Sequence, residues 1–254
     1  MAILWSKKVN GKTYEVRTAG KSRRLYTDGV FHSQYNPDKL ITGQVWDLLM
    51  LPAFFLPESH VKRILVLGVG GGAVIHQYLH FFQPQGVTGI ELDPIHLQVA
   101  RKFFALNRKN VSLINADAQA WVEKEVQRDT IDKYDIIIDD VFGEENGDPV
   151  RAIPATGPWM LKLAKLLNQN GVLICNFPDR VELRESGYFT NKQVQRVFRS
   201  AFQFTAPYNE NAVGVFVRKH AHKKYFWENI QVYKEAYKKN PFTGLRYNVR
   251  PLSL

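Results

Sequence analysis

The sequence predicts an α/β protein with a mostly parallel, Rossmann-like sheet, helices on both faces and a small N-terminal β cap. Three observations favour this class. Short apolar runs alternate with helical segments from about residue 61 onward, which is typical of repeated βα units. A glycine-rich turn at residues 68–72 follows the first of these runs. Two apolar runs at 202–208 and 212–218 flank a polar turn and predict a terminal antiparallel hairpin.

The first 60 residues predict the cap and one connecting helix. Residues 1–36 contain short strands, and Asp28-Gly29 lies between two of them as a hairpin turn. Residues 43–55 predict a buried helix that ends near Pro57. We therefore place a domain boundary near residue 60.

Residues 61–218 predict the main domain. Asp93 is the expected N-cap of a helix that has Pro94 at its first position, and a capping box begins at Thr190. The terminal hairpin is typical of methyltransferase-type sheets and unusual in dehydrogenase-type nucleotide folds. Residues 219–254 predict an amphipathic helix at 225–238 and an irregular tail. Within the main domain we expect strands at 61–67, 87–91, 111–115, 134–139 and 171–177, and helices at 73–82, 94–104, 118–126, 156–167 and 190–200.

The composition predicts no membrane span, no secretory signal and no metal. The longest uncharged apolar run, residues 48–56, contains Pro52 and is far too short to cross a bilayer. Residues 1–8 lack a basic flank before an apolar stretch. Cys175 is the single cysteine, and no Cys/His cluster has the spacing of a zinc site. We therefore expect a cytoplasmic protein without disulfides.

The net charge of +10 lies mainly in the tail. Residues 218–254 carry nine basic and two acidic side chains, whereas residues 61–217 carry seventeen of each. A basic tail suits contact with nucleic acid. The alternative is a solvated helix face, and both interpretations stay open.

The glycine turn and the acid after the next strand predict a nucleoside site. Gly68, Gly70 and Gly72 allow a tight turn before a helix N-terminus, where free N–H groups can face a ligand. Glu91 ends the following strand, where a carboxylate can accept both hydroxyls of a ribose. Glycines also serve structural turns, so the pair of features carries this prediction rather than the glycines alone.

Further carboxylates follow the third and fourth strands of the predicted sheet. Asp117 can accept from an adenine amino group, or cap the next helix, and the two roles are compatible. Asp139 can take a proton from an attacking nucleophile, or bind loop N–H groups. The acidic loop that follows is a candidate lid over a cationic acceptor or a solvated segment; its candidate substrate residues are Asp140, Glu144 and Glu145.

Four segments, residues 64–72, 89–93, 116–118 and 134–139, resemble the spermidine/spermine synthase (aminopropyltransferase) family. The resemblance covers about residues 20–218. It implies the class I methyltransferase fold with an N-terminal β cap, S-adenosylmethionine (SAM) or its decarboxylated form as cofactor, an amine acceptor and a homodimer. By position it implies a nucleoside pocket lined by Gly68, Gly70 and Gly72, a ribose held by Glu91, an adenine facing Asp117 and Ala118, and Asp139 as the base that deprotonates the amine.

The chain departs from the family at positions that bind the amine. Gly71 and Phe142 stand where the family has acids, and His32 replaces a glutamine. Thr42-Gly43-Gln44 stands in place of Tyr-x-Glu. Loss of carboxylates weakens the attraction for a polycation.

We therefore predict a SAM-dependent transferase that moves a methyl group to an amine or a similar nucleophile, with aminopropyl transfer as the alternative. A non-catalytic binding protein with an RNA-contacting tail is the alternative of another class. An NAD(P)-binding oxidoreductase is disfavoured by the terminal hairpin.

Overall fold

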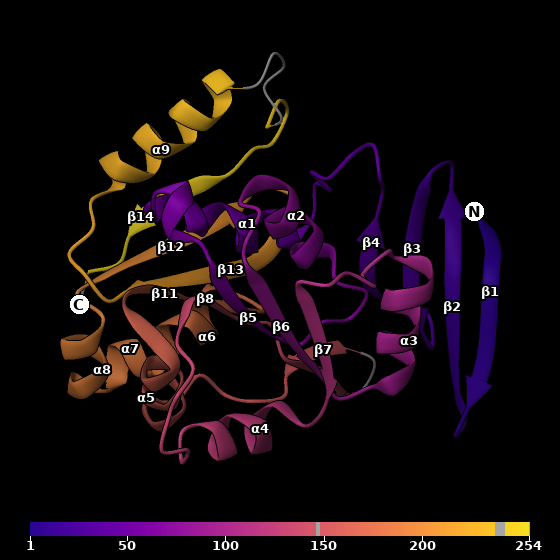
Figure 1. Cartoon of the computed structure of the whole chain (residues 1–254), viewed down its shortest axis with the longest axis horizontal. Helices are drawn as coiled ribbons and strands as arrows, with labels where there is room; N and C mark the ends of the chain where they lie inside the picture. Colours follow the sequence, from indigo (N-terminus) through magenta and orange to yellow (C-terminus); the bar gives the residue numbers. More distant parts are fainter. Residues whose placement is uncertain (146–147, 237–241, 254) are drawn as a thin grey trace.

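The structure is a computed structural model that describes the chain apart from residues 146–147, 237–241 and 254 and the side chains of residues 144, 145, 148 and 236. The described strands form a four-stranded cap sheet, a two-stranded hairpin and an eight-stranded central sheet. Figure 1 shows the cap at one end of the molecule and the last helix at the opposite side of the central sheet.

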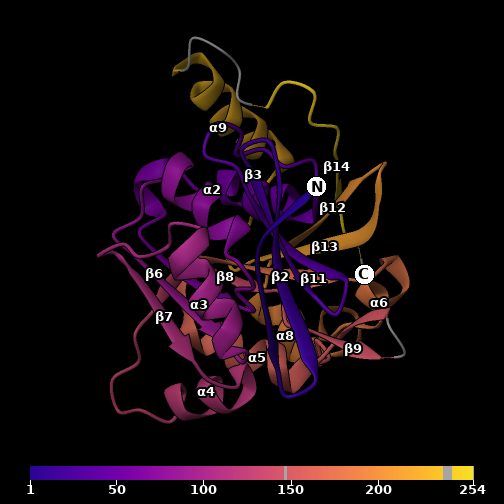
Figure 2. The ribbon, with the colours of Figure 1, turned by 90° about the vertical axis from the view of Figure 1, so that its right-hand side faces the viewer.

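The cap is an antiparallel sheet in sequence order, as the sequence predicts. The turn residues Asp28 and Gly29 have φ angles of 49° and 87°, which the turns of tight hairpins require. Val16 and Leu25 of the cap pack against Val99 and Phe104 of the main domain, so the cap is docked on it (Figure 2). Its strands are β1 (Ala2–Val9), β2 (Lys12–Ala19), β3 (Ser22–Thr27) and β4 (Val30–Tyr35).

The helix expected at 43–55 is divided into α1 (Val45–Met50) and the 3₁₀ helix η1 (Leu51–Phe55). Pro52 explains the division because a proline has no N–H to continue an α-helix and is tolerated in a first turn. A second short 3₁₀ helix, η2 (Glu58–His60), leads into the main domain.

The central sheet has the strand order β14-β12-β13-β11-β8-β5-β6-β7. The middle and one edge are parallel, while β13, β12 and β14 are antiparallel. This confirms the predicted class, including the terminal hairpin. The strands are β5 (Arg63–Leu67), β6 (Gly86–Glu91), β7 (Val111–Asn115), β8 (Tyr134–Asp139), β11 (Leu167–Phe177), β12 (Ser200–Ala206), β13 (Asn209–Val217) and β14 (Asn248–Pro251).

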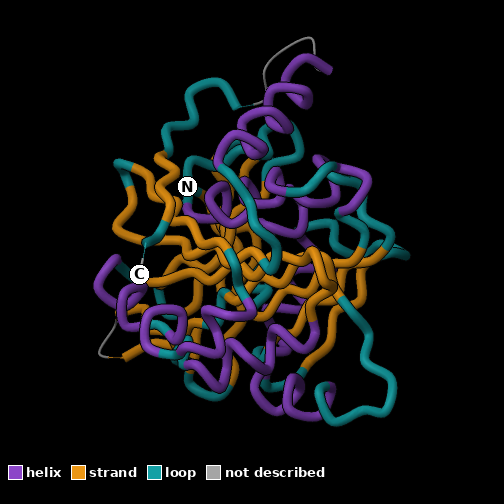
Figure 3. The backbone as a smooth tube through the Cα atoms, turned by 90° about the vertical axis from the view of Figure 1, so that its left-hand side faces the viewer, coloured by secondary structure: helices purple, strands orange, loops and turns teal. Residues whose placement is uncertain are grey.

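Helices cover both faces of this sheet (Figures 1 and 3). Ile64 and Val66 of β5 belong to one core, whereas Leu65 and Leu67 belong to the other, as the alternation of side chains along a strand requires. The first core receives α1, α2 (Ala73–Phe81) and α9 (Lys223–Ala236), and the second receives α4 (Ala118–Glu125), α5 (Gly157–Leu166) and α8 (Lys192–Val197). The remaining helices are α3 (Pro94–Phe103), α6 (Arg180–Glu185) and α7 (Gly187–Thr190).

Three local predictions were wrong. The acidic loop contains a hairpin, β9 (Phe142–Glu145) and β10 (Asp148–Arg151). Asn191, not Thr190, caps α8, because its side chain accepts from the N–H groups of Gln193 and Val194. The tail expected to be irregular contributes β14, which pairs with β12 and extends the central sheet.

Candidate functional site

The predicted site residues meet at the carboxyl ends of neighbouring strands. Leu67 of β5 pairs with Ile90 of β6 and with Asp139 of β8, so the glycine loop, Glu91 and the acids after β8 follow three adjacent strands. Ligands of open parallel sheets bind outside these ends. The fold therefore brings the glycine loop, Glu91 and the acids after β8, which are distant in sequence, to one edge of the sheet.

The glycine loop is packed closely by the protein itself. Gly68 has a φ of +84°, and a Cβ there would lie 2.1 Å from the main-chain oxygen of Asp140. A Cβ on Gly71 would lie 2.2 Å from the ring of Phe104. Glycine is therefore required at both positions by internal contacts, whether or not a ligand binds.

Glu91 reaches the loop directly. Its Oε2 accepts from the N–H groups of Val69 and Gly70 at 3.0 and 2.8 Å, and its Oε1 accepts from Asp93 N–H at 2.9 Å. Burial raises the pKa of Glu91, and these three donors oppose that rise. The carboxylate thus holds the loop in place, and its contact with a ribose stays a prediction.

Asp117 and Ala118 begin α4. The Oδ1 of Asp117 accepts from Ala120 N–H at 2.8 Å, so the side chain caps the helix. Asp117 is exposed, while the side chain of Ala118 packs in the second core. The capping role is therefore present, and it leaves Asp117 accessible to a ligand.

Asp139, the predicted base, lies in a buried ion pair. Its side chain is 0% exposed, and its Oδ2 accepts from Arg151 Nη2 at 2.6 Å and from Trp159 Nε1 at 3.0 Å. A general base must come within hydrogen-bond reach of the proton that it takes. The ion pair uses Oδ2 alone, and Oδ1 of Asp139 is buried without a hydrogen-bond partner among the described residues. The assignment of Asp139 as the base therefore stays a prediction.

Asp140 is a second carboxylate at the end of β8, next to Asp139. It is partly exposed, and its Oδ1 accepts from Asn176 Nδ2 at 2.8 Å. Burial raises the pKa of Asp140 to about 7, while the Asn176 hydrogen bond and the charge of Arg151 oppose the rise. Glu91 and Asp139 raise it further through their negative charges. A carboxylate in this range exists in both protonation states near neutral pH, as acid–base chemistry needs.

Arg151 is a site residue that sequence reasoning missed. Its guanidinium donates to the main-chain oxygens of Asn176 and Ile153, at 2.5 and 2.9 Å, in addition to Asp139. These contacts tie the end of the β9–β10 hairpin to the ends of β8 and β11. The hairpin returns residue 151 to residue 139, and this return could not be read from an acidic stretch expected to be a loop.

The candidate substrate residues Glu144 and Glu145 belong to β9 by their backbone. Their side chains lie outside the described part of the structure. Of the three predicted substrate residues, only Asp140 therefore has a described side-chain geometry.

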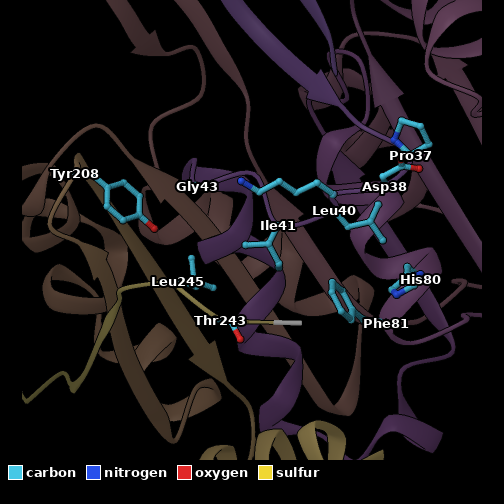
Figure 4. Close-up of a pocket in the computed structure, with 12 residues that line it drawn as sticks. Pro37, Asp38, Leu40, Ile41, Gly43, His80, Phe81, Tyr208, Thr243 and Leu245 are labelled. Carbon is cyan, nitrogen blue, oxygen red and sulfur yellow. The ribbon is translucent and has the colours of Figure 1, made fainter. Parts of the chain in front are cut away.

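A cavity of about 530 Å³ is drawn in Figure 4. Its described lining contains none of the glycine-loop residues, Glu91, Asp117, Asp139 or Asp140, but it includes Gly43, which lies in one of the segments at which the chain departs from the family. It is lined by Pro37, Asp38, Lys39, Leu40, Ile41, Gly43, His80, Phe81, Tyr208, Thr243, Gly244 and Leu245.

The strand order, the glycine loop and the acids at the carboxyl edge define a protein with the class I methyltransferase-like fold. Residues 47–229 match the family described as "Spermine/spermidine synthase domain". The chain belongs to the spermine/spermidine synthase family, which confirms the resemblance.

Two curated relatives illustrate the range of this similarity. The polyamine aminopropyltransferase of Vibrio vulnificus (strain CMCP6) is 28% identical over 160 residues, which cover 63% of this chain and 50% of that protein. An eEF1A lysine and N-terminal methyltransferase homolog of Drosophila pseudoobscura pseudoobscura is 27% identical over 163 residues, which cover 62% of this chain and 24% of that protein. The match thus spans half or less of these relatives.

Solved structures share the fold. A probable spermidine synthase from Corynebacterium glutamicum has a TM-score of 0.75 at 16% identity, covering 99% of this chain and 91% of that one. Human methyltransferase-like protein 13 in complex with SAH has a TM-score of 0.64 at 19% identity, covering 75% and 90%. A spermidine synthase in complex with the transition state analogue AdoDATO has a TM-score of 0.65 at 14% identity, covering 91% and 78%.

The described residues hold neither a metal-binding cluster nor a membrane-spanning helix. They contain no group of three or more His, Cys, Asp or Glu side chains placed to hold a metal ion. No helix within the same residues is long and apolar enough to cross a membrane.

Proposed function

We propose that the protein is a SAM-dependent transferase that moves a methyl group to an amine or a similar nucleophile. The observation that carries the proposal is Asp140, a partly exposed carboxylate with a pKa raised to about 7 beside Glu91 and the glycine loop. Family membership and relatives that are named aminopropyltransferases or methyltransferases support a transfer reaction at this edge.

The residues at the edge fit a cationic adenosine cofactor. Glu91 and Asp140 interact electrostatically and place negative charge where a sulfonium is expected. Asp117 is exposed at the start of α4, after β7, which is the neighbour of β6 in the sheet. A bound SAM supplies an electrophilic carbon on sulfur. The protein's task is then to hold the acceptor in line and to remove its proton.

Asp140 is the proposed base. The lone pair of a neutral amine forms the new bond to carbon while the carbon–sulfur bond breaks and its electron pair stays on sulfur. The amine proton goes to an Asp140 oxygen. Because Asp140 Oδ1 already accepts a hydrogen bond from Asn176 Nδ2, we assign the proton transfer to Oδ2.

The choice of methyl over aminopropyl transfer rests on Gly71. The space beside it is filled by Phe104 and Ser33, so no acidic side chain fits where the resemblance implies an ammonium-binding acid. Transfer of an aminopropyl group from decarboxylated SAM remains the alternative within the same family.

Product analysis tests this proposal. Wild-type protein incubated with SAM and a panel of amines should release S-adenosylhomocysteine. Asp140→Asn should lose at least about 100-fold in turnover, the usual contribution of a general base, while cofactor affinity is retained. Equal turnover by Asp140→Asn would refute the assignment of the base. Product formation from decarboxylated SAM alone would replace methyl transfer by the alternative.

A further inference from the structure

A chain of side-chain amides leads from β13 to Asp140. Asn211 Nδ2 donates to Asn176 Oδ1 at 3.0 Å, and Asn176 Nδ2 donates to Asp140 Oδ1 at 2.8 Å. The three residues belong to neighbouring strands or their ends, since β13 pairs with β11 and β11 pairs with β8. Asn176 is 3% exposed, so its amide is held by the protein.

The charge of Asp140 determines which group donates in each of these two hydrogen bonds. An ionised carboxylate only accepts hydrogen bonds, so Asn176 must turn its NH₂ group toward Asp140. Its oxygen then faces away, and Asn211 must donate to it. The main chain of Asn176 is fixed as well, because its oxygen accepts from Arg151 at 2.5 Å.

We propose that Asn211 is a positioning residue that, through Asn176, favours the ionised form of Asp140 and fixes its orientation; this inference rests on the proposed function. Without Asn211, the Asn176 amide can reverse and present its oxygen to Asp140, which favours the protonated acid. The other charged groups that act on Asp140 are Arg151 on β10, Asp139 on β8 and Glu91 on β6, and these remain in place.

The test is a pH titration of Asp140, observed by carbon NMR in a protein labelled at the aspartate carboxyl carbons. The Asp140 signal is assigned by its absence from the spectrum of Asp140→Asn. Asn211→Asp keeps the size of the side chain but replaces the donor by an acceptor, and Asn211→Ala removes the donor. Both should raise the midpoint of Asp140 by about one to two pH units, the size expected for a lost hydrogen bond to a charged group. Asn248→Ala, at an exposed asparagine on β14, should leave the midpoint unchanged.

The rate profile gives a second readout. In both Asn211 variants the turnover with SAM should require higher pH and recover at high pH, with cofactor affinity unchanged. A purely structural role would lower turnover at every pH. If the titration midpoint of Asp140 stays at the wild-type value in both variants, the proposed role of the hydrogen bonds from Asn211 through Asn176 to Asp140 (the relay) is overturned.

Failure of the relay and failure of the proposed function are separable. The NMR titration needs neither cofactor nor turnover, so a protein that binds no SAM but shows the shifted midpoints overturns only the proposed function. A protein that turns over SAM with unshifted midpoints overturns only the relay.

Discussion

At the scale of single residues, two adjacent aspartates at the end of β8 have opposite environments. Asp139 is sealed with Arg151 and Trp159, whereas Asp140 faces the site with a raised pKa. Side chains alternate between the two sides of a strand, so two carboxylates one residue apart have different partners. The sequence located the pair, and only the packing of Arg151 and Trp159 distinguished its members.

The raised pKa of Asp140 predicts a pH-dependent stability. Its folded-state pKa of about 7 lies above the ordinary value of 3.8, so the native state binds the proton more tightly than the unfolded state does. The stability that this provides is present below about pH 4 and is lost as the pH rises through 7. Raising the pH from 5 to 8.5 should therefore stabilise Asp140→Asn relative to wild type, by at most about 3 kcal/mol in the free energy of unfolding. Urea unfolding of both proteins at pH 5 and pH 8.5 measures this difference in the free energy of unfolding. A difference that does not change with pH would contradict the raised pKa of Asp140.

A side chain at position 71 is expected to clash with its neighbours and to destabilise the protein. A Cβ there would lie 2.2 Å from Phe104 and 2.8 Å from Ser33, so Gly71→Ala should cost about 1–3 kcal/mol in the free energy of unfolding. Gly86→Ala is the matched control, because a Cβ at that position meets nothing within 4 Å. Adding Phe104→Ala to Gly71→Ala should cost less than the two single changes together. Equal stability of the Gly71→Ala and Gly86→Ala proteins would show that the loop yields at no cost.

At the scale of elements, most helices and strands of the main domain follow from periodicity and capping. The expected strands at 111–115 and 134–139 are β7 and β8 without change, and Asp93 caps α3 as predicted, by accepting from Ile95 N–H. The missed elements depend on contacts distant in sequence. β14 is a strand because β12 lies beside it, and the β9–β10 hairpin ends at Arg151, which binds β8 and β11.

The anchoring of that hairpin is testable. Arg151→Ala removes the partner of a fully buried Asp139, and an uncompensated buried charge costs about 3–5 kcal/mol in the free energy of unfolding. Replacing both residues, as in Arg151→Met with Asp139→Leu, should restore part of the loss because no buried charge remains. Chemical denaturation of the three proteins measures this. A double variant no more stable than Arg151→Ala would mean that the ion pair itself is not the source of the loss.

At the scale of the whole molecule, the basic tail is part of the fold. Phe226, Ile230 and Tyr233 of α9 are buried in the first core, and β14 completes one edge of the central sheet. Contact of the tail with nucleic acid stays a prediction, as does a homodimer. The division at residue 218 is likewise a proposal, and the packing of α9 argues for treating residues 61–254 together.

Removal of residues 219–254 should therefore destabilise the protein. The deletion exposes the core surface that α9 covers, and we expect a clear fall in melting temperature, measured by calorimetry. Lys219→Glu with Arg246→Glu, at two exposed basic residues, is the control that alters charge without removing core contacts, and it should melt near wild type. RNA binding is then tested with this charge variant. A truncated protein as stable as the full chain would contradict the integration of the tail.

The central claim is that the carboxyl edge of the sheet binds an adenosine sulfonium. Isothermal titration calorimetry of the wild-type protein with SAM, with NADH as the comparison ligand, tests it most directly. We predict one-to-one binding of SAM, at least tenfold weaker in Glu91→Ala because the carboxylate that holds the loop is lost, and no heat with NADH. Binding of NADH in place of SAM, or no binding of SAM at all, would contradict the claim.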